Sequence, residues 1–105
     1  MSRPANPARG EAAIVVNGEA LVLRPTFEAL VAAEEELGAL FALVERAAAG
    51  GLKLGEIATL FWHCVADRGE SCTRTGIGDA IVEGGLARAT PALKVLLTQI
   101  LQGRV

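Results

Sequence analysis

The sequence is poor in aromatic residues, with no tyrosine, one tryptophan and three phenylalanines among its 105 residues. Proteins that bind single-stranded nucleic acid need such rings, because the bases stack on them. Ten basic side chains against twelve acidic ones give a net charge of −2, and no basic cluster is present. A DNA-binding surface needs clustered Lys and Arg to displace the counterions of the phosphates. We therefore expect no nucleic-acid partner.

Apolar stretches long enough to cross a bilayer are also absent. Residues 1–10 are polar, contain two prolines and lack the apolar centre of a signal peptide, so they predict a disordered N-terminal leader. We expect no contact with a membrane and a cytoplasmic location, in which both cysteines stay reduced. The remaining residues, 11–105, are enough for one globular domain and too few for two.

Side chains for catalysis or metal binding are scarce. The single histidine, His63, together with Cys64 and Cys72 does not give the four ligands in paired spacings that a structural zinc site needs. His63 and Cys64 are neighbours on a predicted helix, so their side chains point about 100° apart and cannot work as base and nucleophile. Only a deep pocket that contained His63, Asp67 and Glu83 would indicate an enzyme. We predict no catalytic site, no cofactor and no metal.

A β-hairpin is predicted over residues 12–23, where two apolar runs flank Asn17-Gly18. Asn-Gly tolerates the two positive φ angles of a type I′ turn, which is the strongest short-range hairpin signal. This turn sets the pairing of the two strands. The expected pairs are Val16 with Glu19, Ile14 with Leu21, and Ala12 with Leu23. Their bulky side chains should cover the helices.

The opposite face of the hairpin is apolar too but smaller. It carries Ala13, Val15, Ala20 and Val22. A lone two-stranded ribbon is barely stable, and its unpaired edges invite association. The hairpin therefore either packs on helices on both sides or lends one face and one edge to a partner.

Five helical segments are predicted after the hairpin. The first, over 27–37, is preceded by Thr26, a good N-cap, and followed by Gly38, which suits the end of a helix. The last begins at Thr90-Pro91, an N-cap with proline at the first helical position. All five are expected over 27–37, 39–49, 54–67, 74–83 and 90–102. The fold class is therefore α+β and mostly α, an N-terminal β-hairpin followed by about five short helices in a small bundle.

Apolar side chains recur at helical spacing and predict the buried faces of three helices. In the segment 54–67 the stripe is Ile57, Leu60, Phe61, Cys64 and Val65. In the last segment it is Leu93, Leu96, Leu97, Ile100 and Leu101. In the first segment it is Phe27, Leu30, Val31 and Leu37. These stripes should form the core beneath the hairpin.

Trp62 lies beside the stripe of its helix rather than within it. It is either a core residue on a second face of the helix or an exposed anchor, and exposed tryptophans carry much of the energy of protein contacts. With Val15, Ala20 and Val22 it forms the set of candidate partner-binding residues.

Three stretches carry a family resemblance. The first is Val-Asn-Gly-Glu at 16–19 running into Leu-Arg-Pro-Thr-Phe-Glu-Ala-Leu at 23–30, with Glu-Glu-Leu-Gly at 35–38. The others are the helix over 57–65 and Ile-Gly-Asp-Ala-Ile-Val-Glu-Gly-Gly-Leu at 77–86. In order and spacing they resemble the small tail proteins of alphaproteobacterial gene transfer agents, a family described as phage tail tube or tail assembly chaperone proteins.

The resemblance implies a product of a prophage-like tail gene cluster that acts in tail assembly. It favours a chaperone that holds the tape measure protein or tail tube subunits, because a tube subunit usually needs a β-rich body that stacks into rings. The first alternative is a structural tail tube or virion component, incorporated in a phage-like particle. The second is a small helical adaptor or regulatory module unrelated to phage. Self-association through the hairpin also stays open.

Overall fold

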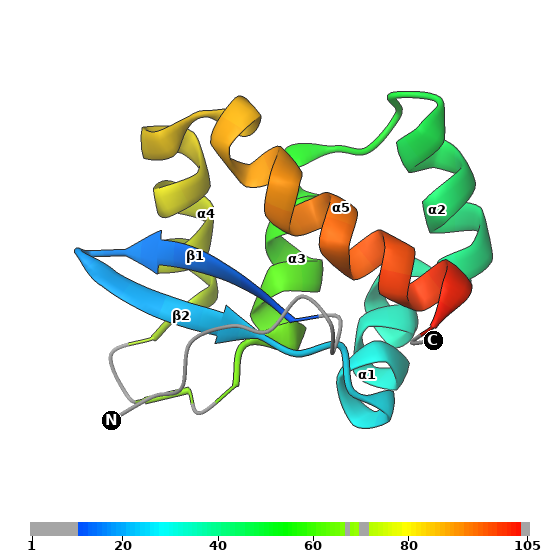
Figure 1. Cartoon of the computed structure of the whole chain (residues 1–105), viewed down its shortest axis with the longest axis horizontal. Coiled ribbons are helices and arrows are strands. Elements are labelled where there is room, and N and C mark those ends of the chain that lie inside the picture. Colours follow the sequence, from blue (N-terminus) through cyan, green and yellow to red (C-terminus); the bar gives the residue numbers. More distant parts are fainter. Residues whose placement is uncertain (1–10, 67, 70–71, 104–105) are drawn as a thin grey trace.

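The computed structural model describes residues 11–66, 68–69 and 72–103, so the predicted leader over 1–10 lies outside the described residues. The predicted fold class is confirmed: an antiparallel hairpin precedes five helices in this part of the chain (Figure 1). The elements are β1 Ala12–Val16, β2 Glu19–Leu23, α1 Phe27–Leu37, α2 Leu40–Ala48, α3 Leu54–Cys64, α4 Arg74–Gly84 and α5 Leu86–Gln102.

The hairpin has the predicted turn and register. Asn17 and Gly18 both have positive φ angles, 53° and 77°, as a type I′ turn requires. Ile14 pairs with Leu21, and the other pairs follow in the same register. The bulky face contributes Ala12, Ile14, Val16, Leu21 and Leu23 to the core or to its margin.

Helix α3 ends earlier than predicted, at Cys64 instead of residue 67. Val65 is extended and forms a β-bridge with Leu23, and the N–H of Ala66 donates to the C=O of Val22 at 2.9 Å. The N–H of Arg24 donates to the C=O of Cys64 at 2.7 Å. These bonds satisfy the exposed edge of β2, which another turn of helix would leave unpaired.

The core lies around α3, which packs between α1 and α4 (Figure 1). Its predicted stripe is confirmed, since Ile57, Leu60, Phe61, Cys64 and Val65 are all buried. Helix α5 crosses the molecule and contacts β1, α4 and α2. In its predicted apolar stripe, Leu96 is fully buried. Leu101 in the last turn is a correction, because it is exposed.

The buried face of α1 differs from the prediction. Phe27 is 84% exposed and Val31 is also exposed, whereas Ala33 is fully buried. Leu30 and Leu37, three and four residues from Ala33, pack against the core. The small Ala33 side chain therefore centres the contact of α1 with α3, and Phe27 in the first turn lies beyond it.

Helix α5 begins at Leu86, four residues before the predicted start. Gly85, with a φ of +85°, makes the break after α4. The Thr90 hydroxyl donates back to the C=O of Leu86 at 2.8 Å instead of capping a helix. Pro91 lies inside the helix, where it removes one backbone donor. The earlier start buries Ala89. Helices α2 and α4 match their predicted bounds to within one residue.

Candidate functional site

The edge of β1 that faces away from β2 is the first component of the candidate site. In a hairpin with a two-residue turn, the pairs that exchange hydrogen bonds are the one closing the turn and every second pair after it. Ala13 and Val15 fall between these pairs, so their N–H and C=O groups point away from β2. The same alternation directs the groups of Val22 and Arg24 outward, and these two bond to the segment after α3.

The two edges of the hairpin therefore differ. The β2 edge is paired with residues 64–66. At the β1 edge, the outward backbone groups of Ala13 and Val15 have no hydrogen-bond partner within the described residues. We call this stretch the open edge.

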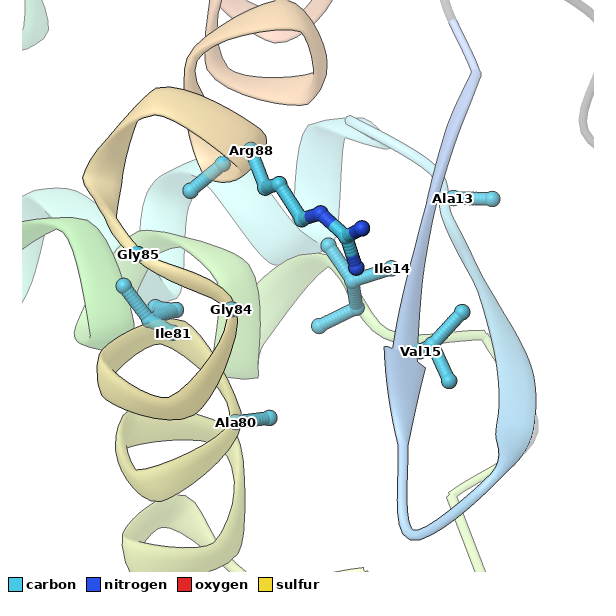
Figure 2. Close-up of a pocket in the computed structure, with 9 residues that line it drawn as sticks. Ala13, Ile14, Val15, Ala80, Ile81, Gly84, Gly85 and Arg88 are labelled. Carbon is cyan, nitrogen blue, oxygen red and sulfur yellow. The ribbon is translucent and has the colours of Figure 1, made fainter.

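An apolar groove runs beside the open edge, and we call it the β1 groove. One wall is β1, and the other is the corner where α4 ends and α5 begins (Figure 2). Its volume of about 250 Å³ is below the roughly 300–1,000 Å³ of sites for drug-sized ligands. The groove thus suits a few side chains of a peptide segment. It is lined by Ala13, Ile14, Val15, Ala80, Ile81, Gly84, Gly85, Arg88 and Ala89.

Arg88 is the one charged residue in this lining. Figure 2 shows its side chain extending from the start of α5 across the groove toward β1. It has no ion-pair partner in the part of the chain that the structure describes. Arg88 also lies in the first turn of α5, where the helix dipole disfavours a cation. A carboxylate placed in the groove would be favoured by the guanidinium and by the helix dipole.

Of the predicted partner-binding residues on the hairpin, Val15 and Ala20 are exposed, and Val15 is 63% accessible. Val22, the third of these residues, is only 7% exposed. The segment after α3 pairs with β2 at this residue, and no pattern in the neighbouring sequence predicts that pairing. The binding roles of these residues stay a prediction.

Trp62 is half-buried and packs against the margin of the core. The guanidinium of Arg68 lies 4.2 Å from the centre of its ring, and that of Arg74 lies 5.8 Å away. Both distances are within the range of a cation–π contact. The ring is therefore shared between the core and two cations, and its role toward a partner stays a prediction.

A polar cluster that sequence reasoning missed joins three helices. The carboxylate of Glu36 in α1 accepts hydrogen bonds from Arg74 of α4 at 2.6 and 2.9 Å and contacts Nε2 of His63 in α3. These bonds, first those from Arg74 and then that from His63, lower the pKa of Glu36 to about 2. Because the three residues are far apart in the sequence, only the fold reveals them.

The arrangement offers little for catalysis. His63 faces Glu36, and Asp67, the second member of the grouping that would have indicated an enzyme, lies outside the described residues. Burial raises the pKa of the Cys64 thiol to about 12, so this thiol stays protonated and is a poor nucleophile. Within residues 11–66, 68–69 and 72–103, no three His, Cys, Asp or Glu side chains gather where they could hold a metal ion.

The same part of the chain contains no helix with the length and apolar character needed to cross a membrane.

Comparison with protein families identifies the class. The family model described as "Phage tail tube protein, GTA-gp10" matches residues 9–103, nearly the whole chain. The chain therefore belongs to this family of gene transfer agent tail proteins, and the resemblance seen in the sequence is confirmed. No curated protein and no solved structure matches it significantly.

Proposed function

We propose that the protein is a tail assembly chaperone. It binds newly made tail subunits, the tape measure protein or the tail tube protein, and holds them until they polymerise. It carries out no reaction. Membership of a gene transfer agent tail family supports the link to the tail, and the surface supports a binding role.

The observation that carries this proposal is the apolar surface around the start of α5. The β1 groove lies on one side of this helix, and a second apolar groove of about 240 Å³ lies on the other side, against α2 and α3. Ala89 lines both grooves. Val82 and Leu86, next to the same corner, are exposed. Single exposed apolar side chains are common on soluble proteins, but a cluster of them marks a contact site.

A structural component of the tail tube is the second candidate, and the description of the family favours it. The small amount of β-strand in the described residues favours the chaperone. The described residues form one sheet of two strands, and one edge of that sheet is already paired with the segment after α3. A subunit that stacks into rings through a β-rich body would need more strand than this.

Two measurements separate the candidates. The full chain is co-expressed with the tape measure and tail tube proteins of the same gene transfer agent, and complexes are separated by size-exclusion chromatography. Purified particles are then analysed by quantitative mass spectrometry. We expect a complex with one of the two proteins in the cell and only trace amounts of the chain in particles. A copy number matching that of a ring-forming subunit would establish the tube role, and binding to neither protein would refute the chaperone role.

A further inference from the structure

We propose that the open edge of β1 receives a β-strand from the tail subunit. The incoming segment is extended and apolar, and it carries a carboxylate that pairs with Arg88. This inference rests on the proposed chaperone function and specifies how the subunit is bound.

The backbone supplies the first reason. The outward groups of Ala13 and Val15 are spaced about 6.7 Å apart, the two-residue repeat of a strand, and they lack partners within the described residues. Edge strands of soluble proteins are normally protected by charge, proline or a bulge. β1 has none of these, because its sequence is Ala-Ala-Ile-Val-Val and all five residues pair regularly with β2. The α4–α5 corner lies beside this edge with the β1 groove between them, so the groove is the place where a strand would be added.

The dimensions of the groove favour a strand over a helix. An added strand lies about 4.8 Å from its neighbour, whereas a helix with side chains is about 10–12 Å wide. The groove holds about 250 Å³ between β1 and the α4–α5 corner. Gly84 and Gly85 keep the facing wall low, since neither has a side chain to project into this space. The groove therefore suits a few alternate side chains of an extended segment, directed toward Ala80 and Ala89.

The positive charge of Arg88 indicates which side chains the incoming strand should carry. Arg88 places at the groove a cation that has no ion-pair partner among the described residues, so the incoming strand should carry Asp, Glu or a terminal carboxylate there. A second copy of this chain would bring its own β1, which has no acidic residue. Its neighbouring Glu11 is already bonded to Arg24 at 2.8 Å. An acidic strand of a different protein therefore matches the groove better than a second copy does.

The probes for the test are overlapping synthetic peptides of about ten residues, the upper length of most strands. They cover the tape measure and tail tube proteins of the same gene transfer agent. Binding to the isotope-labelled full chain is followed by NMR, together with amide exchange at Ala13 and Val15. We expect the binding peptides to be acidic and to slow exchange at both amides by about tenfold or more. Bound peptides that leave both amides exchanging as in the free protein would overturn the inference.

Three variants, measured with the full-length tail subunit, test the same surface. Val15→Pro removes an outward N–H and no bond to β2, Gly84→Leu fills the groove, and Arg88→Glu reverses its charge. Each should weaken binding by about tenfold or more. The matched controls are Gly55→Leu on α3 and Lys94→Glu on α5, both away from the groove, and they should stay within about twofold of the parent.

Thermal melts followed by circular dichroism establish which variants are folded. Should Val15→Pro fail to fold, Gly84→Leu and Arg88→Glu still decide the question. If the folded variants bind the subunit as the parent does, strand addition is wrong and the chaperone role stands. If the parent chain binds neither tail protein, the chaperone role itself is refuted, and this inference with it.

Discussion

The two edges of the hairpin differ in whether their backbone groups are hydrogen-bonded within the described residues. The β2 edge is closed by residues 64–66, where backbone hydrogen bonds of 2.7 and 2.9 Å join it to the chain that leaves α3. The β1 edge has free backbone groups at Ala13 and Val15 within the described residues, and an apolar groove lies beside it. We expect the closed edge to contribute to stability, and we propose that the open edge binds a partner.

The largest effect is expected from a truncation on the closed side. Leu23→Ala removes a fully buried side chain at the end of β2 and should lower the free energy of unfolding by about 2–5 kcal/mol. Val15→Ala, the matched truncation at the open edge, should change it by less than about 0.5 kcal/mol. Urea denaturation measures both. Equal losses would mean that the open edge is part of the core.

A smaller effect is expected from removing one hydrogen bond at the closed edge. Ala66→Pro deletes the N–H that donates to Val22, and the extended Val65 already has a conformation that a following proline permits. The free energy of unfolding should fall by about 1–3 kcal/mol, because a backbone acceptor loses its partner. A shift in the urea midpoint reports the loss. A midpoint like that of the parent would show that this edge contributes no stability.

The hydrogen-bonded cluster of Glu36, Arg74 and His63 should make stability depend on pH. It lies near the closed edge, because His63 is in the last turn of α3. The pKa of Glu36 is lowered from 4.5 to about 2, so the cluster adds stability above pH 4.5. This contribution is lost as the pH falls through about 2, when the folded carboxylate takes up a proton. We expect Glu36→Gln to flatten the decline of the urea midpoint between these two pH values. An unchanged decline in the variant would assign the acid sensitivity to other carboxylates.

For the two thiols we expect almost no effect on stability but a clear difference in the rate of chemical labelling. Cys64 is buried beside the closed edge and its pKa is raised to about 12, whereas Cys72 is partly exposed. A maleimide reagent should label Cys72 quickly and Cys64 only when the protein opens. Mass spectrometry of the labelled peptides distinguishes the two. Equal labelling rates in the folded protein would mean that the region around Cys64 is open to solvent.

Local signals in the sequence were enough to predict the hairpin, its register and the buried face of α3. Asn17-Gly18 determined the turn, and the turn determined which residues of β1 face the core. The apolar stripe of α3 likewise predicted its buried face. These features depend on neighbouring residues along the chain, so periodicity and turn chemistry could reveal them.

The features that were missed depend on residues distant in the sequence. The pairing of Val65 with Leu23 ends α3 early and buries Val22, and it exists only because α3 brings the chain back to β2. The bonds of Glu36 to Arg74 and His63 have the same origin. The position of Arg88 beside β1 depends on where the fold places the α4–α5 corner. None of these contacts leaves a pattern in the residues around it.

Amide hydrogen exchange in the free protein tests the difference between the two edges most directly. We predict slow exchange at Arg24 and Ala66, whose N–H groups donate to Cys64 and Val22. We predict fast exchange at Ala13 and Val15, whose N–H groups have no hydrogen-bond partner among the described residues. Residue-specific rates from NMR give all four values under one set of conditions. Protection of Ala13 and Val15 equal to that of Arg24 and Ala66 would contradict an open β1 edge.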